Sequence, residues 1–423
     1  MYLIIHKPEI KHVRKNWTRL SAQIEYDSFS KEMYFEVPSE YEEYLCSEVA
    51  DAFLLALYYF AANKGYDIKS ESPISEDLLY QFKQYFSYVS LQIDDKHYKK
   101  IQIEAEPICY MVTGNYGVAA SASGGVDSFY SVVSHANHQL KNFRLTHLLV
   151  ANLFNKYDSE EITHSRFNHL CEESKKIAKN YHLSMVPMYT NHYEFLFDNF
   201  VEFYSFRLCS YAMALQKLFK VYLVSSGTRI YDVMFKSDDS SDYDLFNLQI
   251  ASNANLRFYD SGGEVGRIDK LRLIAADSYV NNNLHVCNFN DEINCSACDK
   301  CLRTMADLEM IGKLDLFKNV FNIDEYYKRK NKFWGRVISD SSDIVYGPLY
   351  LEMRREAKQC NYHIPLVSYF YAYLYYIPFS KIKNLLRANK TIHNLYYKFK
   401  IDYLIHGKEK AEIYRYGKDY TEH

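Results

Sequence analysis

The stretch from residue 123 to residue 128 has the composition of a phosphate-binding loop. It reads Ser123-Gly124-Gly125-Val126-Asp127-Ser128. Two glycines let the chain turn sharply and bring backbone N–H groups close to phosphate oxygens, and a helix beginning here would add the positive end of its dipole. The serine hydroxyls can donate hydrogen bonds. The Asp127 carboxylate would repel phosphate unless it acts through Mg²⁺ or holds the loop, so we expect a metal-bridged pyrophosphate.

Four cysteines within fifteen residues form a second chemical pattern. They are Cys287, Cys295, Cys298 and Cys301, spaced C-x7-C-x2-C-x2-C. Thiolates bind Zn²⁺ tetrahedrally at about 2.3 Å, and four protein ligands leave no open position, so we expect a structural zinc site. Lys300 and Arg303 would offset the negative charge of zinc bound by four thiolates. An iron–sulfur cluster and unligated cysteines are the alternatives.

Two basic side chains are candidates for charge stabilisation during a reaction. Lys270 is expected to share a broad helix face with Glu264 and Arg267, since the three are spaced three residues apart. It could neutralise a pyrophosphate leaving group; a solvated helix face is the alternative. Arg229 follows Gly227 and could bind a carboxylate or phosphate in bidentate fashion.

The middle of the chain alternates between strand and helix patterns. The expected strands span residues 117–121, 146–152, 184–189, 221–226 and 256–260, and the expected helices end near residues 138, 181, 219 and 275. This order predicts an α/β fold with a doubly wound parallel sheet and right-handed crossovers. Such sheets bind ligands at the carboxyl ends of their strands, where residues 123–128 would lie. A short strand over 284–287 is expected to lead into the cysteines.

The flanking regions follow other patterns. Residues 1–113 predict an N-terminal α+β domain, with a hairpin over 19–37 and a helix over 39–63. Residues 114–320 would form the nucleotide-binding core with the zinc site, and residues 321–423 a Tyr-rich, mostly helical region. The last part, Lys381–His423, holds ten Lys/Arg against five Asp/Glu. It could contact a partner protein or a phosphate backbone.

Composition narrows the class of protein. The 423 residues are 48% hydrophobic and 24% charged, with a formal net charge of −3. This indicates a globular chain and argues against a wholesale nucleic-acid or membrane-surface binder. An odd number of cysteines, nine, does not suggest a disulfide scaffold. The first residues lack a signal peptide's apolar run, and the uncharged stretch 364–379 is short for a membrane span. We therefore expect a cytoplasmic protein.

The string at residues 123–128 resembles the phosphate loop of the PP-loop ATP-pyrophosphatases. Neither the Walker pattern nor the Rossmann glycine pattern is present. The resemblance implies ATP and Mg²⁺ as cofactors, and a reaction that releases pyrophosphate and leaves an adenylylated substrate. It also implies that adenine lies against the end of the second strand, at Ala151 and Asn152, and that a further nucleotide contact lies near Gly227.

Together with the cysteine spacing, residues 115–318 resemble 7-cyano-7-deazaguanine synthase. The matching features are the entry His285-Val286-Cys287 and the residues after Cys301, namely Arg303, Leu308, Gly312 and Asp315. That enzyme uses ATP to activate 7-carboxy-7-deazaguanine, amidates it with ammonia and dehydrates the amide to a nitrile. The chain departs from the family in its long flanking regions. It also departs at residues 225–232, where the family's substrate-reading run Asp-x-Ser-x-Tyr-Pro-Asp-Cys-Arg is missing.

Three functions follow as hypotheses. The first is an AMP- and pyrophosphate-forming ligase for a carboxylic acid, such as a 7-deazaguanine acid. Ammonia or an amine of a partner protein would accept the acid, the latter as the resemblance suggests for synthase-like proteins of antiviral operons. The second is a tRNA-modifying enzyme of the same superfamily, a thiolase or lysidine-type ligase, but no convincing sulfur-transfer cysteine pair is visible. The third is a nucleotide-sensing, non-catalytic partner protein, against which the intact string with Asp127 argues.

Overall fold

The computed structural model describes residues 1–94, 97–152, 160–195, 204–235, 240–287, 293–339 and 347–376, without the side chains of 160–163, 347–348 and 375–376. The chain forms two compact units. The first contains residues 1–123 and 127–266, and the second contains residues 124–126 and those from 267 onward. The basic tail from residue 381 lies outside the described residues.

A single sheet runs through the first unit. Its eleven strands are β1 (Tyr2–Ile5), β2 (Glu9–Arg14), β3 (Trp17–Tyr26), β4 (Phe29–Pro38), β5 (Asp67–Ser70), β7 (Ile103–Glu104), β9 (Gly117–Ala120), β10 (His147–Ala151), β11 (Ser184–Thr190), β12 (Phe219–Ser225) and β13 (Arg257–Ser261). They lie in the order β13-β12-β9-β10-β11-β4-β3-β1-β5-β7, with β2 beside β3. A separate pair joins β6 (Ile74–Ser75) to β8 (Pro107–Ile108).

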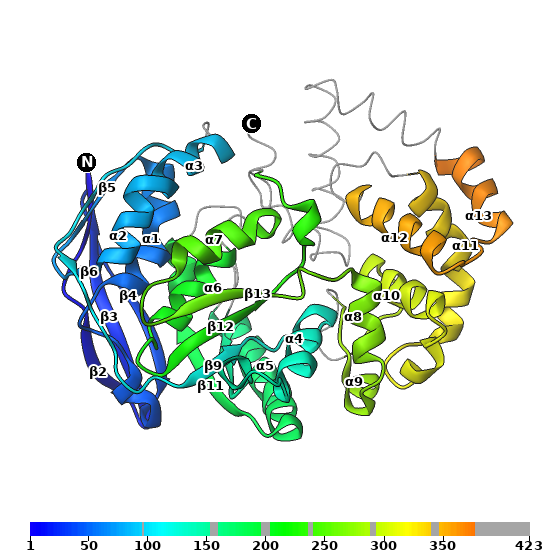
Figure 1. Cartoon of the computed structure of the whole chain (residues 1–423), viewed down its shortest axis with the longest axis horizontal. Coiled ribbons are helices and arrows are strands. Elements are labelled where there is room, and N and C mark those ends of the chain that lie inside the picture. Colours follow the sequence, from blue (N-terminus) through cyan, green and yellow to red (C-terminus); the bar gives the residue numbers. More distant parts are fainter. Residues whose placement is uncertain are drawn as a thin grey trace. The chain divides into compact units, whose positions relative to one another are not determined.

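The part of the sheet from β9 to β13 is entirely parallel. Numbered along the chain, these five strands lie in the order 3-2-1-4-5, which is a doubly wound arrangement. Helices α4 (Val126–Ala136) and α5 (Glu160–Tyr181) lie on one face, and α6 (Tyr204–Met213) and α7 (Asp244–Ala251) on the other (Figure 1). The predicted α/β class is thus confirmed. The order changes direction beside β9, so the crevice expected to hold a ligand begins where β9 ends.

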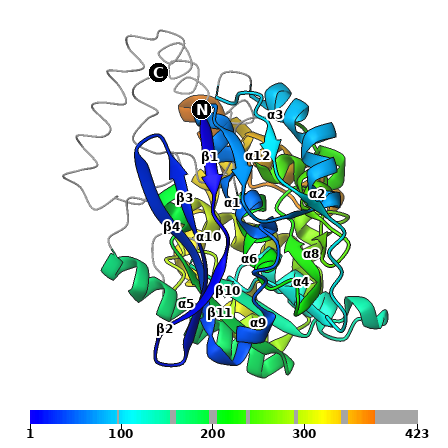
Figure 2. The same cartoon turned by 90° about the vertical axis from the view of Figure 1, so that its left-hand side faces the viewer.

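The N-terminal strands extend this same sheet. The predicted hairpin is β3–β4, with Asp27 in its two-residue turn at a φ of 51°. Strand β4 pairs antiparallel with β11, with Glu36 opposite Tyr189 and Phe35 opposite Thr190. Figure 2 shows β4, β3 and β1 side by side. Residues before and after position 113 therefore share one sheet and one hydrophobic core.

The helix expected over residues 39–63 is divided in two. A 3-10 helix covers Ser39–Tyr44, and α1 covers Asp51–Lys64. The prediction of one continuous helix was wrong because backbone groups between them bond elsewhere, as when Cys46 N–H donates to the Ala214 carbonyl at 3.0 Å. Nearly all of α1 is buried, as expected for a helix that is apolar all round.

Shorter helices complete the first unit. They are α2 (Glu76–Gln81), a π-helical turn (Phe82–Phe86), α3 (Ser87–Ile93) and 3-10 helices at Lys141–Phe143, His192–Phe195, Ile230–Asp232 and Ser240–Tyr243.

The second unit is helical in its described part. It contains α8 (Arg267–Ile274), α9 (Ser278–Asn283), α10 (Asp299–Met310), a 3-10 helix (Leu314–Phe317), α11 (Ile323–Ser339), α12 (Gly347–Gln359), α13 (Leu366–Tyr371) and a π-helical turn (Ala372–Tyr376). The strand expected at residues 284–287 is not formed; instead His285 N–H donates to the Gly124 carbonyl at 2.9 Å. No helix in the ranges described here is both long and apolar enough to cross a bilayer.

Candidate functional site

The predicted phosphate loop begins three residues after the end of β9 at Ala120 and includes the start of α4 (Val126–Ala136). Gly124 has a φ of +75°, which residues with a Cβ rarely adopt. The hydroxyl of Ser123 donates to that of Ser128 across the loop at 3.2 Å. Asp127 lies in the first turn of α4 and is partly exposed. The loop therefore combines a left-handed glycine, two hydroxyls and a helix N-terminus, which together suit an anionic group.

Two hydrogen bonds hold α4 against the end of β12 and the turn after β13. Ser131 on α4 shares a hydrogen bond of 2.9 Å with Ser225, the last residue of β12. The Tyr130 hydroxyl donates to Glu264 at 2.8 Å. Both contacts are made by the helix turn that follows the loop, so they fix the direction of the helix N-terminus. Sequence reasoning did not identify either contact, since their partners lie 94 and 134 residues away.

The turn after β13 is tightly built around two glycines. Gly262 has a φ of +94°, and its N–H donates to Glu264 at 3.1 Å. A Cβ on Gly263 would overlap the Asp260 carboxylate, which accepts the Gly263 N–H at 3.1 Å. A side chain at position 263 would therefore require the Asp260 carboxylate to move. Its carbonyl accepts the Ile230 N–H at 2.8 Å, which ties the segment after β12 to this turn.

Arg229 and Gly227 follow the carboxyl end of β12. Gly227 is exposed and has open space where a Cβ would be. The guanidinium of Arg229 contacts one oxygen of Asp232 through Nε at 2.8 Å and Nη2 at 2.7 Å. The pair is only partly buried, with 26% and 46% of the two side chains exposed. A substrate carboxylate or phosphate would therefore have to share Arg229 with Asp232.

Ala151 and Asn152 lie at the end of β10, as expected, but both are buried. The Asn152 amide accepts the Thr190 N–H and donates to the Thr190 carbonyl, both at 2.8 Å. These two bonds fasten the end of β10 to the end of β11. Asn152 therefore has a structural role here, and contact of either residue with adenine stays a prediction.

The helix face predicted for Glu264, Arg267 and Lys270 is not formed as expected. Helix α8 begins at Arg267, and Glu264 lies before it in the turn after β13. Glu264 belongs to the first unit, and the two basic residues belong to the second. Arg267 pairs with Asp307 at 2.9 Å. The side chain of Lys270 is 4% exposed, which is not a solvated position.

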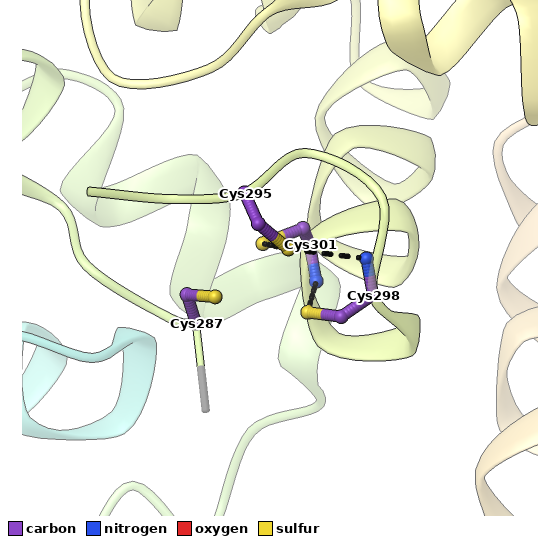
Figure 3. Close-up of side chains that lie close together, drawn as sticks. All are labelled: Cys287, Cys295, Cys298 and Cys301. Carbon is purple, nitrogen blue, oxygen red and sulfur yellow. Dashed lines mark hydrogen bonds between the residues drawn. The ribbon is translucent and has the colours of Figure 1, made fainter. Parts of the chain in front are cut away.

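The structure brings the four predicted metal ligands together in the second unit (Figure 3). The sulfur atoms of Cys287, Cys295, Cys298 and Cys301 all lie within 4.8 Å of one another, and the Cys295–Cys301 distance is 4.0 Å. Sulfurs at about 2.3 Å from a tetrahedral zinc ion lie about 3.8 Å apart. The donor set and its spacing therefore fit a metal ion such as zinc.

Local hydrogen bonds favour a thiolate at Cys298, whereas the pKa of Cys301 is raised by its hydrogen bond to Cys298 and by burial. Cys298 N–H donates to the Cys295 sulfur at 3.3 Å, and Cys301 N–H to the Cys298 sulfur at 3.5 Å. Hydrogen bonds from the thiol and the N–H of Cys301 lower the pKa of Cys298 to about 5. Cys298 is the N-cap of α10 and Cys301 lies in the first turn of this helix, whose N-terminus also favours negative charge.

Asn294 connects the distant ligand Cys287 to the other three. Its Oδ1 accepts the N–H groups of Val286 at 2.8 Å and Cys287 at 3.2 Å. Its Nδ2 donates to the carbonyls of Leu284 at 2.8 Å and Val320 at 3.1 Å. Sequence reasoning missed this residue, since an Asn before a Cys has no distinctive pattern.

Buried charges gather between α8, α10 and α12 of the second unit. Besides the Arg267–Asp307 pair, Arg303 contacts Glu352 at 3.3 Å. Glu356 is 5% exposed, and one of its oxygens accepts a backbone N–H at the start of α8 at 3.1 Å. Burial raises the pKa of Asp307 to about 6 and that of Glu356 to about 8. From the sequence we expect Arg303 to offset the negative charge of a zinc site. In the structure this side chain faces carboxylates.

Comparisons of this chain with protein families, with curated proteins and with solved structures find no match. The residues themselves therefore carry the functional argument. They provide a loop with a left-handed glycine at the switch point of a parallel sheet and, in the second unit, four cysteines whose sulfur atoms converge.

Proposed function

We propose that this protein is an ATP-dependent ligase that forms AMP and pyrophosphate while activating a carboxylic acid. The observation that carries the proposal is the position of residues 123–128. The loop follows the central strand of a parallel sheet, turns at Gly124 with a φ of +75°, and opens α4. The resemblance of this string to the PP-loop supports ATP as the ligand.

The residues of the loop fit a metal-bound triphosphate. The serine hydroxyls and the first N–H groups of α4 are donors for phosphate oxygens, whereas Asp127 offers a carboxylate in the same first turn. Mg²⁺ held by Asp127 and the phosphates would neutralise charge on the departing pyrophosphate. Asp127 is thus the residue most specific to this chemistry, because a simple phosphate site has no use for an anion.

The proposed reaction needs no nucleophilic side chain. A carboxylate oxygen of the substrate attacks the α-phosphorus of ATP, the bond to the β-phosphate bridging oxygen breaks, and pyrophosphate leaves. An amine then attacks the acyl carbon and AMP departs. Ammonia or an amine on a partner protein would serve as acceptor. Positioning and charge stabilisation should supply most of the rate enhancement, with Arg229 as a candidate contact for the acid.

We also propose that the four-cysteine cluster binds zinc as a structural ion. All four positions of a tetrahedron would be filled by thiolates, which leaves none for substrate. The bond from His285 N–H to the Gly124 carbonyl connects the segment entering this cluster with the loop. The ion would therefore contribute to holding Gly124 in its left-handed conformation.

Release of AMP and pyrophosphate from Mg-ATP tests the proposal. The purified chain would be assayed alone, with 7-carboxy-7-deazaguanine, and with acetate as a control acid. Stimulation by the deazaguanine acid alone would support the ligase and identify its substrate class. Stimulation only by RNA would instead favour a tRNA-modifying enzyme. If the chain neither forms AMP nor binds ATP by calorimetry, the loop assignment is wrong.

A further inference from the structure

A second candidate binding region lies in the first unit, away from the phosphate loop. It is a cavity of about 790 Å³, within the range typical of ligand sites. Its lining comes from α2, the π-helical turn, β8, α7 and the first residue of β13, and comprises Glu76, Asp77, Leu79, Tyr80, Gln81, Lys83, Gln84, Tyr85, Pro107, Gln249 and Arg257. Since β13 runs parallel to β9, the start of β13 and the phosphate loop lie at opposite edges of the sheet.

The π-helical turn at Phe82–Phe86 explains how two tyrosines meet in this cavity. In a regular α-helix, residues five apart point about 140° away from each other. A π-turn, with its i to i+5 hydrogen bonds, brings such residues onto one side. Accordingly, the rings of Tyr80 and Tyr85 lie 5.9 Å apart at 75°. Phe82 and Phe86 remain fully buried on the core side. Such turns are rare and are frequent at functional sites.

Charged side chains beside the tyrosines have no ion-pair partner among the residues that the structure describes. Glu76 and Asp77 lie in the first turn of α2 and line the cavity. Lys83 and Arg257 also line it without forming an ion pair. Four charges left without partners in one cavity suit a ligand that presents complementary polar groups along its length.

A neighbouring contact shows which charge this helix accepts on its tyrosines. Tyr88 on α3 carries the Lys100 ammonium at 4.1 Å from its ring centroid. Cations are attracted to the faces of aromatic rings, and a nearby carboxylate attracts the same cation through its charge. Tyr80 and Tyr85 line the cavity together with Glu76 and Asp77, so they offer exposed rings and carboxylates to a cation from outside the chain.

We propose that this cavity docks an extended basic peptide segment of a partner protein. Residues Tyr80 and Tyr85 are 59% and 49% exposed, which is too open for a small molecule that must bury most of its surface. Arginine or lysine side chains of the peptide would contact the tyrosines and the two carboxylates. Lys83 and Arg257 would donate to backbone carbonyls, which every extended segment presents. This docking does not depend on the adenylylation chemistry.

Fluorescence anisotropy with labelled peptides tests the docking on the full chain. The probe is an eight-residue peptide of alternating arginine and glycine, and the control probe replaces arginine by glutamate. We expect the arginine peptide to bind at least about tenfold more tightly. Equal binding of the two probes, or preference for the glutamate peptide, overturns the proposal. So does competition by single-stranded oligonucleotide with higher affinity than the peptide, because exposed tyrosines can also stack on bases.

Matched variants locate the binding. The double substitution Glu76→Gln and Asp77→Asn changes charge on an exposed helix turn without removing volume, so the fold should persist. It should weaken binding of the arginine peptide by about tenfold or more and make that binding less dependent on salt concentration. Tyr80→Ala with Tyr85→Ala should have a similar effect, whereas Tyr88→Ala, an exposed tyrosine outside the lining, should not. Unchanged affinity in both double variants would refute the site even if AMP formation is normal.

Discussion

The four-cysteine cluster and the phosphate loop are specified by the sequence in different ways. Three cluster ligands fall within seven residues, and their N–H···S bonds are local. The loop also has a local bond, from Ser123 to Ser128, but the helix it opens is braced by residues 94 and 134 positions away. The cysteine cluster thus depends mainly on its own residues, whereas the loop at residues 123–128 depends on the sheet that carries it. Substitutions in the two regions should differ accordingly.

The largest effect is expected from removing a cluster ligand. Cys298→Ser should abolish tight metal binding and destabilise the second unit by roughly 5 kcal/mol, since metal affinity contributes directly to folding. Zinc content by mass spectrometry and hydrogen exchange over residues 293–339 measure this. Cys109→Ser, which alters an exposed thiol of the first unit, is the control. Normal exchange in a metal-free variant would show that the cluster has no structural ion.

Asp127→Ala should impair the reaction without destabilising the fold. We expect AMP formation to fall by about 10³-fold or more, equivalent to about 4 kcal/mol of transition-state stabilisation, with little change in the melting temperature. Asp269→Ala, on an exposed i,i+3 pair with Arg272, should change neither. A variant of Asp127 that melts early would mean that this residue holds the loop rather than a metal-bound phosphate.

Asn294→Ala should weaken the cluster without removing a ligand. Four hydrogen bonds would be lost, two of them to groups beside Cys287, and we expect a loss of about 2–3 kcal/mol in unfolding free energy. A chelator competition should show weaker zinc binding. Asn319→Ala breaks only an exposed amide pair with Asn282 and should have little effect. Equal losses of unfolding free energy in the two variants would contradict the proposal that Asn294 connects Cys287 to the other three cysteines.

The buried charges of the second unit should make its stability depend on pH. The pKa of Glu356 is raised to about 8 and that of Asp307 to about 6, mainly by burial. Between a pH of about 4.5 and 8 the folded unit therefore binds more protons than the unfolded chain, so its stability falls as pH rises through this window. Glu352, Arg303 and Arg267 face the same cluster.

Urea unfolding followed by hydrogen exchange in the second unit measures this dependence. We expect a loss of about 2 kcal/mol between pH 6 and pH 8 in the wild type. Glu356→Gln should be less pH-dependent, because the amide cannot ionise. A wild-type unit that gains stability over this range would contradict a protonated Glu356.

The smallest effect is expected at the turn of the loop. Gly124→Ala should cost about 1–2 kcal/mol, because its φ is +75°. The new methyl group would meet only His285 Cβ at 3.8 Å, an ordinary contact. Gly227→Ala, in open space, should leave the unfolding free energy unchanged. If both glycines tolerate alanine equally, the left-handed turn does not define the loop.

Much of the fold could be predicted because its signals are local. The strand before the loop was expected at 117–121 and is formed at 117–120, and the four cysteines converge as their spacing indicates. Errors arose where distant groups decide the outcome. No local pattern shows that His285 bonds to Gly124 and that residues 284–287 do not form a strand. Likewise, nothing near Glu264 indicates that it turns toward Tyr130 instead of continuing a helix.

The seam between β4 and β11 has a consequence for synthesis on the ribosome. The partner of Glu36 and Phe35 emerges about 150 residues after them, which at common elongation rates is roughly 8 to 30 s. During that time the edge of β4 has no strand beside it, and such edges invite pairing between nascent chains. Glu36 bonds to Arg19 on β3 at 2.8 Å, a contact the hairpin can form at once. The charged pair at the unpaired edge of β4 would disfavour pairing with strands of other chains until β11 has been synthesised.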